Sequence, residues 1–168
     1  MRYLIIIFYF FIIFFKSQFL YAQNLVYLDI NFIINNSLIG KKISNELDLI
    51  NKKNLTYLKQ EQSILNNKRI EIENKKNIVS EEKLKSQIDI LNNEIDLFKK
   101  KQDQLSLEFK ELNRNKINEL IKKINSIIEQ YMIKNEIRII FNKESVYVSL
   151  DDGDITNEIL ELVDSVLK

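Results

Sequence analysis

The chain contains no cysteine, no histidine and no proline, and it has only two glycines among its 168 residues. Without cysteine there is no disulfide and no thiol nucleophile, and without histidine there is no imidazole-based triad and no zinc site of the usual kind. Glycine-rich loops are also absent, so we expect neither enzymatic activity nor a cofactor. Because no helix-breaking residue lies between Gly40 and Gly153, the sequence predicts long helices.

An excess of charge of either sign is also missing, because Lys and Arg number 25 against 24 Asp and Glu. Removal of the first 22 residues would leave 146 residues with a net charge of −1. No strong overall field therefore draws the chain to nucleic acid, and we expect no nucleic-acid partner. The net charge gives no indication of membrane contact either, although a local basic patch could still act.

The N-terminus is typical of an export signal. Arg2 precedes an unbroken apolar run from Tyr3 to Phe15, which is too short to span a bilayer as a free-standing helix. We expect cleavage between Ala22 and Gln23, so that residues 1–22 form a signal peptide and the mature protein leaves the cytoplasm. The absence of disulfides suits the periplasm, which is the location we expect. The alternative is an uncleaved anchor that continues through residues 16–21.

The dominant pattern is a ladder of apolar residues at alternating steps of three and four, which is the signature of a coiled coil. It comprises Leu84, Ile88, Leu91, Ile95, Phe98, Gln102, Leu105, Phe109 and Leu112, and only Gln102 is polar. The preceding segment keeps one apolar position per heptad at Leu58, Leu65, Ile72 and Val79, with Gln62, Arg69 and Lys76 at the alternate positions. We therefore expect a thinner, more mobile seam toward the tip.

A break between the two helical segments is expected near Ser80. Its hydroxyl can accept from the amides that open the next helix, and Glu81 and Glu82 favour the positive end of that helix. Val79 and Leu84 occupy the positions of a hydrophobic staple. The sequence thus predicts an antiparallel helical hairpin over 41–134 with its tip near 77–83, and the alternative is one uninterrupted helix through Ser80.

The two ends of the chain are expected to form a small body at the root of the hairpin. We predict a strand within 24–30, one or two helical turns at 31–36, a β-hairpin from 137–141 and 146–150, and a closing helix capped by Asp154. A broad apolar stripe from Ile117 to Met132 exceeds what one partner helix would cover. The fold class is α+β, mostly α: a long antiparallel hairpin coiled coil on a small β-strand oligomerisation body over 23–40 and 135–168. Its oligomerisation core should comprise Val26, Leu28, Ile124, Ile128, Ile139, Phe141, Val146 and Val148.

Three charged motifs have competing interpretations. Gly40 and Lys41 lack the earlier glycine and the following Ser or Thr of a phosphate loop, so we expect no nucleotide binding. The acidic residues at 151, 152 and 154 are better explained as a turn and a helix cap than as a cation site, and we expect no metal. A mixed-charge patch near the tip is either a solvated face or a surface for clients or membrane, and its basic residues are Lys68, Arg69, Lys75, Lys76, Lys83 and Lys85.

This order of elements resembles the Skp/OmpH family of periplasmic chaperones over nearly the whole mature chain. The matching residues are 26–30 followed by Asn36-Ser37 and Gly40-Lys41, the tip residues 80–82 before Leu84, and 154–156 before the closing helix. The resemblance implies a homotrimer whose helical arms surround a cavity that holds unfolded outer-membrane proteins without ATP. The structural alternative is a periplasmic coiled-coil spacer or assembly adaptor, held by an uncleaved N-terminus.

Overall fold

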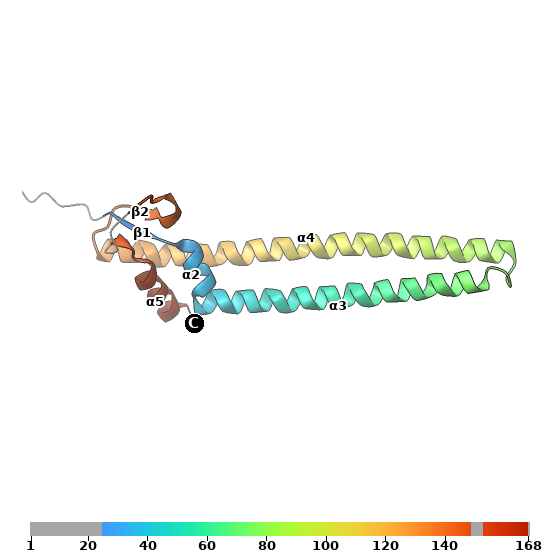
Figure 1. Cartoon of the computed structure of the whole chain (residues 1–168). Coiled ribbons are helices and arrows are strands. Elements are labelled where there is room, and N and C mark those ends of the chain that lie inside the picture. The colour runs from blue at the N-terminus through green and yellow to red at the C-terminus, as the bar shows by residue number, and fades with distance from the viewer. Residues whose placement is uncertain (1–24, 149–152, 168) are drawn as a thin grey trace, which may run out of the picture.

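The computed structural model describes residues 25–148 and 153–167. Two long antiparallel helices, α3 (Leu38–Lys75) and α4 (Glu81–Lys134), lie side by side and form an arm that projects from a small base (Figure 1). The base contains β1 (Val26–Leu28), α2 (Ile30–Asn36), β2 (Ile140–Asn142), a 3₁₀ turn η1 (Lys143–Ser145) and α5 (Thr156–Val166), together with the last turns of α4. At ~1.5 Å per residue, the 54 residues of α4 extend ~80 Å.

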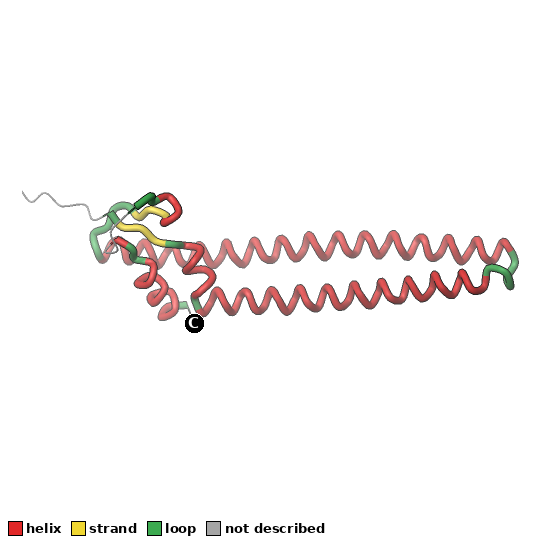
Figure 2. The backbone as a smooth tube through the Cα atoms, viewed as in Figure 1, coloured by secondary structure: helices red, strands yellow, loops and turns green. Residues whose placement is uncertain are grey.

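The two helices are joined by a short turn at 76–80, which we call the tip (Figure 2). Ser80 is the N-cap of α4, where its hydroxyl accepts from the Lys83 amide at 3.4 Å, and Glu81 and Glu82 occupy the first turn. The predicted break is therefore confirmed, and a single helix through Ser80 is excluded. Ile78 at the tip is 83% exposed.

The seam between the helices is only partly apolar. Leu47 and Leu91 are buried, whereas Leu58, Leu65 and Ile72 are half-buried. The expected alternate positions Gln62, Arg69 and Lys76 are all exposed, and Asn54 and Glu61 are half-buried instead. Both sets of positions on α3 are compatible with heptad spacing. The rotation of α3 against α4 decides which set lies in the seam.

The main core lies in the base and is made by residues far apart in the sequence. Ile33 of α2, Leu120 and Ile124 of α4, and Ile159 and Val163 of α5 are almost fully buried and belong to one cluster. Val26 and Leu28 of β1 complete it. The broad apolar stripe on α4 is thus covered largely by elements of the same chain, because α2, β1 and α5 pack on its root.

The sheet differs from the expected one. β2 pairs with β1 in parallel, with Val26 opposite Ile140 and Leu28 opposite Asn142, and Tyr27 makes a second, isolated parallel bridge to Asp154. The β-hairpin predicted from 137–141 and 146–150 is therefore wrong over its described part: η1 follows β2 at once, and 146–148 are not a strand. The Asn142 side chain accepts from the Glu144 amide at 3.2 Å, which favours the tight turn, while β1 offers β2 a more buried partner. Residues 149–150 lie outside the described part.

A sharp corner sets the direction in which the arm leaves the base. Ser37 is fully buried, ends α2 and caps α3, with its hydroxyl accepting from the Gly40 amide at 3.1 Å. A Cβ on Gly40 would lie 1.7 Å from the carbonyl oxygen of Ile34. Although the sequence predicted a hairpin that begins at 41, Gly40 lies in the first turn of α3, where only glycine permits this approach of the two helices.

Candidate functional site

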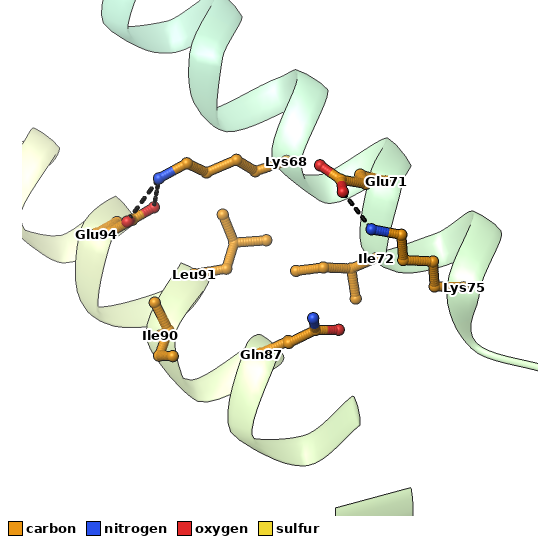
Figure 3. Close-up of a pocket in the computed structure, with 8 residues that line it drawn as sticks. All are labelled: Lys68, Glu71, Ile72, Lys75, Gln87, Ile90, Leu91 and Glu94. Carbon is orange, nitrogen blue, oxygen red and sulfur yellow. Dashed lines mark hydrogen bonds and ion pairs between the residues drawn. The ribbon is translucent and has the colours of Figure 1, made fainter. Parts of the chain in front are cut away.

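A shallow groove runs along one flank of the arm between α3 and α4 and consists of two adjoining pockets. The pocket nearer the tip has a volume of about 200 Å³, and the other has a volume of about 330 Å³. Lys68 and Glu94 line both pockets and separate them. In the pocket nearer the tip, Ile72 and Leu91 point toward each other between the helices, with Ile90 at the rim (Figure 3).

The rim of the groove carries both signs of charge. Lys68 donates to both carboxylate oxygens of Glu94 at 2.6 and 2.7 Å across the two helices, and Lys75 pairs with Glu71 within α3. The hydrogen bond from Lys75 lowers the pKa of the Glu71 carboxyl below its ordinary value. Lys68, Glu71 and Lys75 are exposed and Glu94 is partly exposed, so each pair contributes little to stability. The opposite charges leave the groove electrically neutral.

The second pocket exposes apolar side chains at its edge. Tyr57 and Ile64 lie seven residues apart on α3, and the apolar residues that line this pocket from α4 are Leu97 and Phe98. Tyr57, Ile64, Ile90 and Leu97 are all exposed large apolar residues. Our sequence prediction missed this flank because it considered the seam alone, although the seven-residue spacing of 57 with 64 and of 90 with 97 was a visible signal.

The predicted basic patch is placed around the tip, but it is not one continuous surface. Lys68 and Lys75 lie on the groove flank and are paired with acidic residues, while Arg69 lies one position beyond Lys68 on α3. Lys76 belongs to the tip, and Lys83 and Lys85 lie in the first turns of α4. Arg69, Lys76, Lys83 and Lys85 form no ion pair with another described residue. The structure thus divides the patch into paired and unpaired cations.

The residues predicted for an oligomerisation core also divide into two groups. Val26, Leu28 and Ile124 are buried inside the single chain, and Ile128 packs against the same cluster. Ile139, Phe141 and Val148 are exposed, and Val146 is half-buried. Tyr147, beside them, is fully exposed. An apolar surface therefore remains around β2 and η1 after the core of the chain is complete.

A polar cluster ties the closing helix to the strands. Lys143 Nζ lies 2.6 Å from Asp154 Oδ2, and the other oxygen of Asp154 accepts from the amide of Thr156 at 3.0 Å. The buried Thr156 hydroxyl also accepts from the amide of Asp29 at 3.0 Å, next to β1. The predicted cap is therefore one residue out of place: Ile155 is the N-cap of α5 and makes no side-chain cap hydrogen bond, whereas Asp154, the residue before it, accepts from the Thr156 amide that opens the helix.

This cluster shifts two pKa values in opposite directions. Burial alone would raise the pKa of Asp154, but hydrogen bonds from Lys143 and Thr156 outweigh it and hold the pKa below its ordinary value. The hydrogen bond to Asp154, reinforced by its charge, raises the pKa of Lys143. Lys143 also lies 5.9 Å from the centroid of the Tyr27 ring. The cluster therefore remains charged through the neutral pH range.

Within residues 25–148 and 153–167, no group of three or more acidic side chains is arranged to hold a metal ion. Two of the three acidic residues weighed as a cation site, 151 and 152, lie outside these ranges, as do Ala22 and Gln23 of the predicted cleavage site. None of the helices in the described part is long and apolar enough to cross a membrane.

The fold defines the class of the protein: it is a mostly α-helical protein in which a long antiparallel helical hairpin with an apolar flank projects from a small base with two strands. Residues 24–163 match the family model for outer membrane proteins of the OmpH-like type. The chain belongs to this OmpH-like family, and the resemblance seen in the sequence is confirmed.

The fold of a solved structure agrees with this assignment. A candidate outer membrane chaperone (OmpH-like) from Caulobacter crescentus superimposes with a TM-score of 0.83 at 18% sequence identity, covering 88% of this chain and 87% of that one. The expected fold class is thereby confirmed. No curated protein matches the sequence.

Proposed function

We propose that this protein is an ATP-independent holdase of the periplasm, which binds unfolded outer-membrane proteins between helical arms and prevents their aggregation. The observation that carries the proposal is the row of exposed apolar side chains along an arm that has almost no core of its own. Contiguous exposed apolar surface is typical of interaction sites. Membership of the OmpH-like family supports the same function.

The proposed mechanism is multivalent trapping. Each arm offers several weak apolar contacts, and several arms held on one base would present them at high effective concentration to the same unfolded chain. The charged rim of the groove keeps the arm soluble while its apolar side chains remain accessible. Release would follow when the client folds into the membrane and buries the segments that the arms had held.

The proposal includes a homotrimer formed through the base. Ile139, Phe141, Tyr147 and Val148 are apolar, exposed and close in sequence, and they stand outside the completed core of the chain. Burial of this surface against neighbouring copies would remove it from water and hold the arms at a common root. Export and cleavage after Ala22 belong to the same proposal, since the clients pass through the periplasm.

Dilution of a urea-unfolded outer-membrane β-barrel into the purified mature protein tests this function. We expect light scattering to stay low and a complex with roughly three copies of this chain per client to elute from a sizing column. Unchanged aggregation with no co-eluting complex would contradict the holdase function and favour the spacer.

A further inference from the structure

The two pockets of the groove repeat along the arm with a definite spacing. Leu65 and Phe98 line one pocket, and Ile72 and Leu91 line the other. The corresponding residues are seven positions apart on each helix, so the pockets are ~10 Å apart along the arm. Each pocket is open, and their volumes of about 200 and 330 Å³ lie at or below the low end of small-molecule sites. Each has room for one large side chain.

The spacing distinguishes between conformations of a bound chain. In a β-strand, side chains on one face recur every two residues, which places them ~7 Å or ~13 Å apart. In a polyproline II segment, which is a major conformation of unfolded chains, they recur every three residues at ~9 Å. The distance between the pockets fits the second case and lies midway between the two values for a strand.

The ridge between the pockets suits the backbone of such a segment. Lys68 and Glu94 meet there and are both partly exposed, so the ridge offers a donor and an acceptor to a peptide group that crosses it. Because the two charges neutralise each other, the groove selects no charge of one sign. Its complement is therefore a neutral, extended segment with apolar side chains on one face.

We propose that the groove of one arm holds an unfolded segment in an extended, polyproline II-like conformation, with large apolar side chains at positions i and i+3 seated in the two pockets. This inference rests on the proposed holdase function and specifies the surface and the spacing by which clients are bound. It predicts that the flank with Ile64, Ile90 and Leu97 contacts clients, whereas exposed leucines elsewhere on the arm do not.

Two labelled, unstructured peptides of identical composition test the spacing, one with phenylalanines at i and i+3 and the other with phenylalanines at i and i+2. We expect the full mature protein to bind the first about tenfold more tightly, as measured by fluorescence anisotropy. Equal affinity for the two peptides would overturn the inference.

Paired substitutions test the surface. Ile90→Ser with Leu97→Ser removes two groove side chains that are 57% and 65% exposed, and Leu49→Ser with Leu107→Ser removes two that are 67% and 62% exposed and line neither pocket. The groove variant should bind the i, i+3 peptide about tenfold more weakly, and the control variant should bind it unchanged. Equal losses in both variants would overturn the inference.

The β-barrel aggregation assay, run on the same three proteins, separates this inference from the proposed function. If the unmodified protein suppresses aggregation and the groove variant does so equally well, the groove inference fails and the holdase function stands. If the unmodified protein does not suppress aggregation, the holdase function fails, and the groove inference fails with it.

Discussion

Lys116 of α4 lies 2.9 Å from a carboxylate oxygen of Glu46 on α3, 70 residues away in the sequence. The second bridge between the helices, Lys68 with Glu94, has the same register: the interval from 46 to 68 on α3 equals the interval from 94 to 116 on α4. Glu61 and Lys101, which line one pocket together, also fit this register. The charge pairs therefore share one register between α3 and α4, whose apolar contacts with each other are sparse.

The register prediction concerns charge reversal at Glu46 and Lys116. Glu46→Lys or Lys116→Glu alone places like charges opposite each other and should lower the free energy of unfolding, by about 1 kcal/mol or less because the pair is partly exposed. The double variant restores opposite charges and should recover most of the loss. Thermal unfolding at low salt and at 1 M salt measures the coupling, which should weaken as salt screens it. If the double variant loses as much free energy of unfolding as the two single variants together, the pair does not stabilise this register.

The corner between α2 and α3 predicts a large effect of one methyl group. Gly40→Ala should destabilise the chain by about 3 kcal/mol, because the new Cβ would collide with the Ile34 carbonyl and force the arm away from the base. Urea unfolding at a fixed protein concentration gives the value. Ser44→Ala, at an exposed position of the same helix, should change stability by about 0.5 kcal/mol at most. Equal stability of both variants would show that the corner can relax.

The Asp154 cluster predicts a specific pH dependence. Because the folded-state pKa of Asp154 is lowered, its contribution is complete above the unfolded value near ~4 and is lost as the pH falls through the folded value. Because the folded-state pKa of Lys143 is raised, its contribution is complete below ~10 and is lost as the pH rises through the folded value. The pair should therefore stabilise the base at a constant level from about pH 4 to pH 10.

Asp154→Asn tests this window. We expect this substitution to lower the free energy of unfolding by up to about 1 kcal/mol at pH 7. When the pH is lowered from 7 to below ~4, the variant should lose less stability than the unmodified chain. Asp48→Asn is the control, since Asp48 is exposed on α3 and has no ion pair with a described residue. A difference between Asp154→Asn and the unmodified chain that is the same at pH 3 and pH 7 would argue against the ionised cluster.

The helical hairpin was predictable because its signals are local. The ladder from Leu84 to Leu112 determines a long helix, and Ser80 followed by two glutamates determines where it begins. The strand at 26–28 and the helix at 30–36 were likewise visible in short patterns of residues. Each depends on neighbours within a few positions, so no knowledge of distant contacts was needed.

The pairing of β2 was not predictable in the same way. The segments 137–141 and 146–150 both favour strands, and a local hairpin is the simplest way to pair them. In the structure β2 pairs instead with β1, more than a hundred residues earlier, which requires a long crossover that only the folded hairpin supplies. The isolated β-bridge between Tyr27 and Asp154 also joins segments that are distant in the sequence, so it was equally unpredictable from local patterns.

The sequence by itself determined the helical arm, its tip and the Ser80 cap of its second helix, because periodicity and capping act within a few residues. The tertiary structure alone decided which polar residues enter the seam, which flank carries the groove, and which predicted oligomerisation residues are already buried in one chain. The physical reason is that heptad spacing leaves the rotation of each helix open, and the packing of α2, β1 and α5 on the root of α4 selects it. The requirement for glycine at position 40 is likewise a tertiary effect, because Gly40 approaches the Ile34 carbonyl only when α2 packs against α3.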